Sequence, residues 1–297
     1  MNLSDLLTEA RNPFTEKIDE LPTLDMLRLI SDEDRKAVAS VVATLPDIAK
    51  AVDEIALRIK DGGRLFYIGA GTSGRLGVLD ASEIPPTFSI PSNLVQGIIA
   101  GGDSALRKSS ESSEDSEEQG ADDLAAAGFS GQDVLVGIAA SGRTPYVLGA
   151  LQHAIPLGAL TVALTSVPNS PMAAISDLAI TPITGPEAIT GSTRMKAGTA
   201  TKLVLNMLST GVMIKIGAVY GNLMVNLAPT NAKLIDRAQR IIMAATGIDQ
   251  PTAAALLENS GNVKTAIVMQ KLSLDRPTAE ARLATHKGNL AALLHQS

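Results

Sequence analysis

Two loops of small and hydroxylated residues each follow a strand-like run, an arrangement typical of anion sites. The first loop, Gly69-Ala-Gly-Thr-Ser-Gly74, follows the run 64–68, and the second, Ala140-Ser-Gly-Arg-Thr144, follows the run 133–139. Glycine lets the backbone approach a ligand closely, and a helix that begins after such a loop adds unpaired N–H groups and the positive end of its dipole. Ordinary helix caps are the alternative, but two such loops favour a phosphate site. The candidate donors are Gly71, Thr72, Ser73, Ser141, Gly142 and Thr144.

The elements that must position these loops alternate between strands and helices. Strand-like runs occur at 64–68, 94–99, 133–139, 159–164 and 178–181, with helix-competent segments between them. This pattern predicts an α/β fold with a doubly wound, five-stranded parallel sheet that is covered by helices on both faces. Ligands of such sheets bind at the carboxyl ends of the strands, beside the point where the strand order reverses. We therefore expect the two loops to share one crevice.

The flanks of the sheet region have a helical pattern. Residues 1–54 are predicted to form a helical segment, with a helix that starts at Ser31-Asp-Glu-Asp34, and a long apolar helix is expected within 193–218. Several short helices punctuated by glycine and proline follow. The predicted domains are the N-terminal segment 1–54, the sheet domain 55–218 and a helical region 219–297, which contains a small bundle at about 247–292.

Composition excludes several classes of function. The chain has 297 residues, a net charge of −6, seven aromatic residues, three histidines and no cysteine. The absence of cysteine excludes thiolate metal sites and cysteine nucleophiles, and three scattered histidines argue against a metal site. The acidic balance and the few aromatic residues argue against nucleic acid as a partner. Because no apolar stretch reaches transmembrane length, we expect no membrane association and a cytoplasmic location.

Two groups of acids could supply acid–base chemistry. In Asp80-Ala-Ser-Glu-Ile-Pro-Pro86, the prolines predict that a helix from Ser73 ends near Ile84. Glu83 would then lie at the negative end of the helix dipole, which would raise its pKa toward that of a general acid. The alternative is an ordinary exposed carboxylate. The segment 111–123 carries seven acids and no base; most of it is expected to be a solvated helix face, and composition does not select a catalytic member.

Several blocks of the sequence resemble one family. The two loops resemble the sugar isomerase (SIS) fold family, which binds phosphosugars, and longer blocks resemble the N-acetylmuramic acid 6-phosphate etherases within it. The glucokinase regulatory protein is a relative that shares the fold but only binds phosphosugars. The blocks are Thr8-Glu-Ala-Arg-Asn12, Ile18-Asp19, Ser31-Asp-Glu-Asp34, Gly69-Ala-Gly-Thr-Ser-Gly-Arg-Leu-Gly77, Leu79-Asp-Ala-Ser-Glu-Ile-Pro-Pro-Thr87, Ile99-Ala-Gly-Gly102 and Gly191-Ser-Thr-Arg-Met-Lys-Ala-Gly-Thr-Ala-Thr-Lys202.

The resemblance implies a SIS-type fold and a defined reaction. Enzymes of this family remove the D-lactyl ether from C3 of a phosphorylated amino sugar during cell-wall recycling. Two glutamates carry the chemistry, and their motifs correspond here to Glu83, as general acid, and Glu114, as base. The resemblance further implies a phosphosugar substrate, a homodimer, and neither a metal nor another cofactor.

The same resemblance adds three cations to the candidate site and shows one departure. Arg143 of the second loop is expected to bind the substrate. Arg194 and Lys196 are expected to supply charge to the phosphate or to the lactyl carboxylate; the alternative for these two is a place on the surface or at a dimer interface. The wider family often has a serine where this chain has Ala139, so the second loop lacks one hydroxyl donor.

Other functions on this fold remain as alternatives. A phosphosugar isomerase would need the same phosphate cradle and a base at C2, but the long blocks argue against it. A glucosamine synthase is excluded because its glutaminase half needs a cysteine. A non-catalytic phosphosugar-binding regulator is the main alternative, although such a protein would need no acid–base pair. The segment from Gly247 onward resembles a ubiquitin-associated bundle, which we expect to pack near the crevice or to brace a dimer rather than to bind ubiquitin.

Overall fold

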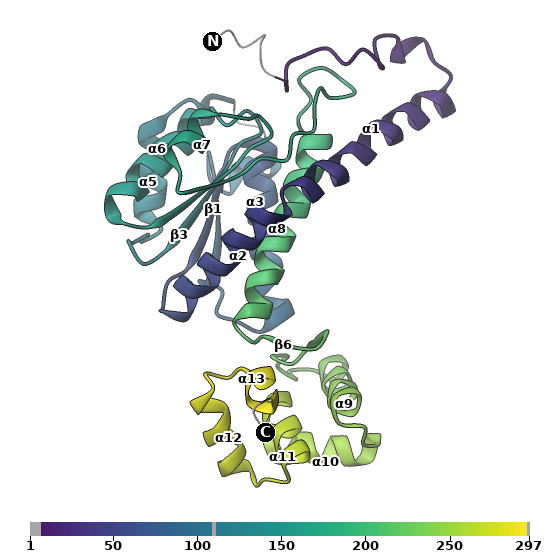
Figure 1. The fold of residues 1–297 in the computed structure, drawn as a ribbon, viewed down its shortest axis with the longest axis vertical. Helices are drawn as coiled ribbons and strands as arrows, with labels where there is room; N and C mark the ends of the chain where they lie inside the picture. The colour runs from purple at the N-terminus through teal and green to yellow at the C-terminus, as the bar shows by residue number, and fades with distance from the viewer. Residues whose placement is uncertain (1–6, 109–110, 296–297) are drawn as a thin grey trace. The chain divides into compact units, whose positions relative to one another are not determined.

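A parallel sheet organises the N-terminal part of the chain. The computed structural model describes residues 7–108 and 111–295. The five strands lie in the order β2-β1-β3-β4-β5 (Figure 1). The strand order reverses between β1 and β3, which places the switch point of the sheet there. The predicted parallel α/β sheet is confirmed. Its strands are β1 (Leu65–Gly69), β2 (Val95–Ile99), β3 (Val134–Ile138), β4 (Leu160–Leu164) and β5 (Leu178–Ile180).

Helices cover both faces of this sheet. Phe66 and Ile68 of β1 belong to a buried cluster with Tyr146 and Leu124, which come from helices on one face; Tyr67 points to the other face. Figure 1 shows α5, α6 and α7 on the first face and α2, α3 and α8 on the second. The helices are α1 (Thr23–Ala43), α2 (Leu45–Lys60), α3 (Gly71–Phe88), α4 (Ser104–Arg107), η3 (Glu111–Glu114), α5 (Glu117–Ala126), α6 (Pro145–Ala154), α7 (Pro171–Ile175) and α8 (Lys196–Lys215).

Two helix boundaries differ from the sequence prediction. Helix α1 begins at Thr23, directly after Pro22, so Ser31 lies inside a helix rather than at its start. Helix α3 continues through Pro85 and Pro86 to Phe88 instead of ending near Ile84. Its buried positions Ala81, Ile84 and Phe88 have helical spacing. We attribute the continuation to this buried stripe, whose packing offsets the backbone hydrogen bonds that the prolines remove.

The chain divides into two compact units. The first comprises residues up to Ser82 together with Asn93–Thr210, so the N-terminal helices belong with the sheet; residues 1–6 of that segment lie outside the described residues. The second comprises Glu83–Ser92 and Gly211–Ser297. Its elements are the hairpin β6 (Val219–Tyr220) and β7 (Leu223–Met224), and helices α9 (Ala232–Thr246), α10 (Gln250–Ser260), α11 (Val263–Leu272), α12 (Arg276–Thr285) and α13 (Leu290–His295).

Short helices in the second unit are defined by their caps and by one core. Helices α9 to α12 each begin after an Asn or Asp whose side chain accepts the N–H of the residue three positions on; the caps are Asn231, Asp249, Asn262 and Asp275. Such caps satisfy N–H groups that a short helix would otherwise leave unpaired. Buried residues such as Ile242, Ala253, Ile267 and Ala279 form the shared core.

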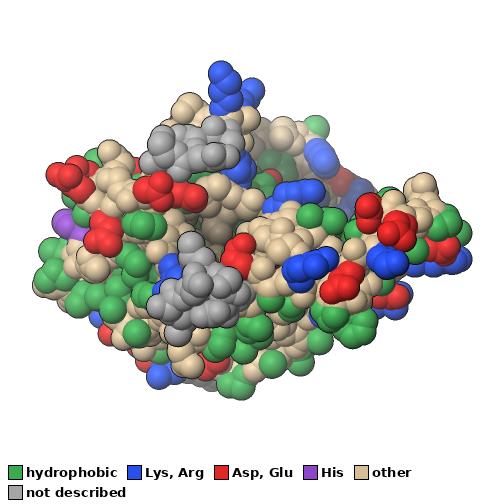
Figure 2. All heavy atoms as spheres, turned by 90° about the horizontal axis from the view of Figure 1, so that it is seen from above, with side chains coloured by type: hydrophobic (Ala, Val, Ile, Leu, Met, Phe, Trp, Pro, Cys, Tyr) green, Lys and Arg blue, Asp and Glu red, His purple; other side chains and the backbone are tan. Residues whose placement is uncertain are grey.

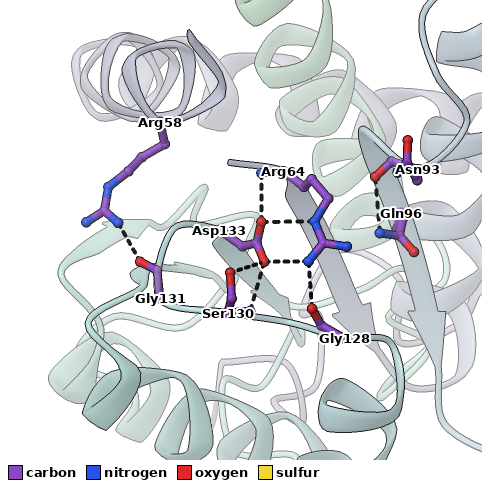
Figure 3. A network of polar contacts seen from close by, with 8 residues as sticks. All are labelled: Arg58, Arg64, Asn93, Gln96, Gly128, Ser130, Gly131 and Asp133. Carbon is purple, nitrogen blue, oxygen red and sulfur yellow. Dashed lines mark hydrogen bonds and ion pairs between the residues drawn. The ribbon is translucent and has the colours of Figure 1, made fainter. Parts of the chain in front are cut away.

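An ion pair joins β1 and β3 at their amino ends, opposite the predicted site. Asp133 is buried, and its carboxylate accepts the Arg64 backbone N–H at 2.8 Å and the guanidinium at 3.1 and 2.8 Å (Figure 3). Ser130 donates its N–H and hydroxyl to the same carboxylate. Burial raises the pKa of Asp133, but these hydrogen bonds outweigh it and hold the pKa below its usual value. The contacts keep β1 and β3, which carry the two loops, in register.

Candidate functional site

The first loop turns directly from β1 into helix α3. At Gly69 an added Cβ atom would lie 2.8 Å from the backbone nitrogen of Gly74, so the strand end and the first helical turn approach too closely for a side chain. Gly71 has φ +52° and opens the helix, and Thr72 and Ser73 follow half-buried in its first turn. The first turn of α3 contains no acidic residue. Its N–H groups and hydroxyls are therefore suited to an anion.

The second loop repeats this arrangement between β3 and α6. Gly142 has φ +63°, and an added Cβ would overlap the Ser170 side chain. The Ser141 hydroxyl oxygen accepts the Arg143 N–H at 3.3 Å, which leaves its own proton available to a ligand. Thr144 precedes α6, but its side chain makes no capping hydrogen bond. Since a capping hydroxyl would be occupied, we interpret Thr144 as a further donor for a ligand.

The two loops meet in one cavity of about 250 Å³ at the carboxyl ends of β1 and β3. The prediction of a shared crevice is therefore consistent with the structure. The start of α8 and part of the N-terminal segment also line the cavity. Its lining is Thr8, Glu9, Ala70, Gly71, Thr72, Ser73, Glu114, Ile138, Ala139, Ala140, Ser141, Thr144, Thr193, Ala197, Gly198 and Thr201.

The described lining of this cavity combines neutral donors with two carboxylates. It contains no lysine or arginine, so recognition of a phosphate here depends on hydroxyls and on the helix N-termini of α3 and α6. The start of α8 is different, because the Glu187 carboxylate accepts the N–H groups of Lys196 and Ala197 at 3.0 and 2.9 Å. Burial raises the pKa of Glu187 although these hydrogen bonds oppose the shift. Helix α8 is thus capped by the protein itself.

Of the two predicted catalytic glutamates, Glu114 lines this cavity. It ends η3, the short 3-10 helix after β2, and is exposed. The acidic segment 111–123 is therefore divided by the fold: Glu114 lines the cavity, whereas Glu117, Glu118 and Asp122 are exposed on α5. This division follows from tertiary packing.

Glu83 is exposed on helix α3 and is absent from the described lining of the cavity. The expectation that it terminates a helix is wrong, because α3 continues to Phe88. Glu83 is therefore not at the negative end of the helix dipole.

The three predicted cations do not line the cavity in the described structure. Arg194 is exposed, and Arg143 is half-buried beside Gly142. Lys196 is buried, and its ammonium donates to the Glu33 carboxylate at 2.6 Å. The expectation that Lys196 contacts the phosphate is therefore not met: its charge is already neutralised inside the protein, where an unpaired ammonium would be costly.

Sequence reasoning missed Thr8, Glu9, Thr193 and Thr201 as residues of the cavity. Thr8 and Glu9 begin a block that carried the family resemblance, but no catalytic or phosphate motif marked them.

Among the described residues no cluster of three or more histidine, aspartate or glutamate side chains could hold a metal ion. On the face shown in Figure 2, basic side chains are scattered among acidic ones. No helix in the described ranges combines the length and apolar character needed to span a bilayer.

Comparison with protein families gives the class that this fold and cavity define. Residues 110–211 match the SIS domain, and residues 47–155 match the glucokinase regulatory protein N-terminal SIS domain. A solved phosphoheptose isomerase from Francisella tularensis has a similar fold, with a TM-score of 0.50 and 19% identity over 65% of this chain and 98% of that one. The protein is of the SIS class.

Relatives that match along the whole chain identify the family. An N-acetylmuramic acid 6-phosphate etherase from Cronobacter sakazakii is 54% identical over 295 residues, which is 99% of both chains. One from Salmonella choleraesuis is 53% identical over the same share. The chain belongs to the N-acetylmuramic acid 6-phosphate etherase family, as the sequence blocks predicted.

Proposed function

We propose that the protein cleaves the D-lactyl ether of N-acetylmuramic acid 6-phosphate and releases D-lactate and N-acetylglucosamine 6-phosphate. The observation that carries this proposal is the cavity in which two phosphate-type loops and Glu114 come together. Identity above 50% with etherases over the whole chain supports the same substrate. We expect the reaction to take place in the cytoplasm and to need no cofactor.

The reaction needs acid–base chemistry because an ether at C3 resists simple hydrolysis. Opening of the sugar ring exposes an aldehyde at C1, which acidifies the proton on C2. A carboxylate base removes that proton, the bond from C3 to the lactyl oxygen breaks, and an acid protonates the departing oxygen. Water then adds to C3 of the unsaturated aldehyde, and a proton returns to C2. The two loops would hold the 6-phosphate while this occurs.

Glu114 is assigned as the base because it lines the cavity beside the phosphate loops. Glu83 is assigned as the acid from the family motif, but it is absent from the described lining of the cavity. We infer that Glu83 reaches the reacting carbons from a second copy of the chain, and therefore that the enzyme is a homodimer. Its exposure on α3 supports such a role.

Isotope labelling tests the proposed reaction. The purified protein is incubated with N-acetylmuramic acid 6-phosphate in deuterated, oxygen-18-enriched water, and both products are analysed by mass spectrometry. Elimination followed by hydration gives D-lactate without new oxygen, and a sugar with deuterium at C2 and oxygen-18 at C3. If lactate is not released although the phosphosugar binds tightly in calorimetry, the protein is a non-catalytic phosphosugar-binding regulator, and the proposal is wrong.

A further inference from the structure

Two residues of the N-terminal segment line the cavity, and neither has a role in the chemistry above. Thr8 is 2% exposed, and its hydroxyl has no hydrogen-bond partner among the described residues. Glu9 is exposed, and among the described residues its carboxylate has no hydrogen-bond or ion-pair partner. Buried hydroxyls are nearly always paired in folded proteins. An unpaired one in the wall of a cavity therefore indicates a group that a ligand satisfies.

The N-terminal segment is fastened to the first unit directly after these residues. The Asn12 side chain donates to the carbonyl of Pro186 at 3.3 Å and also hydrogen-bonds Glu33. Glu33 in turn pairs with Lys196 at the start of α8. These contacts hold residues 8–12 against the loop that precedes α8, so the place of Thr8 and Glu9 in the cavity wall follows from an internal network.

A glycine in the loop before α8 lies close to the Glu9 carboxylate. Gly191 has φ +75°, and a Cβ atom added there would lie 3.1 Å from Glu9 Oε2. A side chain at this position would crowd the carboxylate. Because Gly191 has no side chain, the Glu9 carboxylate has room to line the cavity.

We propose that Thr8 and Glu9 bind the sugar part of the substrate, with the Glu9 carboxylate accepting a hydrogen bond from a neutral sugar hydroxyl or amide N–H. This inference rests on the proposed function and adds a specificity-determining element to the same site. Charge decides the kind of group that Glu9 binds. A carboxylate repels both the phosphate and the lactyl carboxylate, so only a neutral donor is a favourable partner. The phosphate is left to the loops at α3 and α6, which supply donors.

Binding measurements on Glu9→Gln test this assignment, because glutamine keeps the shape and removes the charge. Calorimetry is performed with N-acetylglucosamine 6-phosphate and, separately, with inorganic phosphate. We expect affinity for the phosphosugar to fall roughly tenfold, because the neutral amide oxygen of glutamine accepts a weaker hydrogen bond than a carboxylate does. Affinity for inorganic phosphate should stay equal or rise, since a repelling charge is removed. Glu16→Gln, in the same segment but outside the cavity lining, is the control and should bind both ligands as the wild type does.

Thr8→Val gives a second readout that separates ligand binding from structural support. The valine is isosteric and removes only the unpaired hydroxyl, so the thermal midpoint should stay equal or rise while phosphosugar affinity falls several-fold. A lower midpoint with unchanged affinity would show that Thr8 only supports the fold.

Two outcomes of these binding measurements would overturn the inference. One leaves the proposed function standing, and the other overturns it as well. If Glu9→Gln binds the phosphosugar as tightly as the wild type, the assignment of Glu9 is wrong and the proposed reaction stands. If the wild-type protein itself fails to bind N-acetylglucosamine 6-phosphate and to release lactate, the proposed function is wrong and the sugar-binding role of Thr8 and Glu9 falls with it.

Discussion

The ammonium of Lys196 lies 2.6 Å from the carboxylate of Glu33, and both side chains are almost completely buried. This pair connects α1 to the first residue of α8, at the point where α8 contributes to the cavity wall. Lys36 also donates to Glu33, and Asn12 adds a further hydrogen bond. Lys196 therefore supports the cavity wall by holding the start of α8 against α1, and it does not line the cavity itself.

Removal of Lys196 should destabilise the protein without removing a phosphate contact. In Lys196→Met the Glu33 carboxylate stays buried with Lys36 as its remaining cation, so we expect a loss of about 3 kcal/mol, the lower end for a broken buried pair. Urea unfolding measures this loss. Lys36→Met is the control, because this half-exposed lysine should contribute about 1 kcal/mol or less. Equal stability of Lys196→Met and the wild type would contradict the structural role.

The same network predicts how stability depends on pH. Burial works to raise the pKa of Glu33, but hydrogen bonds from Lys196, Lys36 and Asn12 outweigh it and hold the pKa below the usual 4.5. A lowered pKa in the folded state means that the ionised carboxylate contributes fully above about 4.5 and that this contribution is lost as the pH falls further. Urea midpoints measured from neutral to acidic pH should therefore decline more steeply for the wild type than for Glu33→Gln. Parallel profiles would count against this prediction.

The second loop should not tolerate a side chain at Gly142. Gly142→Ala places a Cβ at φ +63° and against Ser170, which should cost about 1–2 kcal/mol from the backbone conformation alone and should also displace Ser141. Gly158→Ala is a matched control, since Gly158 has φ +79° but no atom within 4 Å of an added Cβ. Both variants should lose stability, and only Gly142→Ala should also lose affinity for inorganic phosphate. Equal phosphate affinity in the two variants would show that the loop does not bind the anion.

The proposed shared site predicts complementation between two inactive variants. Glu83→Gln and Glu114→Gln should each lose nearly all lactate release while keeping phosphosugar binding, because the loops that hold the phosphate are unchanged. In a mixed two-fold dimer, one of the two sites would receive both intact glutamates. Unfolding and refolding the variants together should therefore restore part of the activity. No recovery in mixed dimers confirmed by mass spectrometry would place both glutamates on one chain or remove one from the mechanism.

The boundary of helix α3 shows where sequence patterns are insufficient. Local rules predict a helix end before Pro85, but the buried stripe Ala81, Ile84 and Phe88 continues the helix, and Glu83 lies inside it. Propensity is a local preference, and packing of a buried face overrides it. Lys196 was expected to supply charge to the phosphate or to the lactyl carboxylate, but its ammonium pairs with Glu33, 163 positions away in the chain, and no local pattern indicates that contact.

The sequence by itself determined the parallel sheet, the two loops and the family, because each depends on a short pattern of residue types. Strand hydrophobicity and loop glycines are local properties, and parallel strands bring their carboxyl ends to one edge wherever they pair. Only the tertiary structure decided which acids and cations face the cavity. Glu114 is selected from an acidic run, Glu9 is brought from the N-terminal segment, and Lys196 is turned inward toward Glu33. These placements depend on contacts between residues far apart in the chain, which no local spacing records.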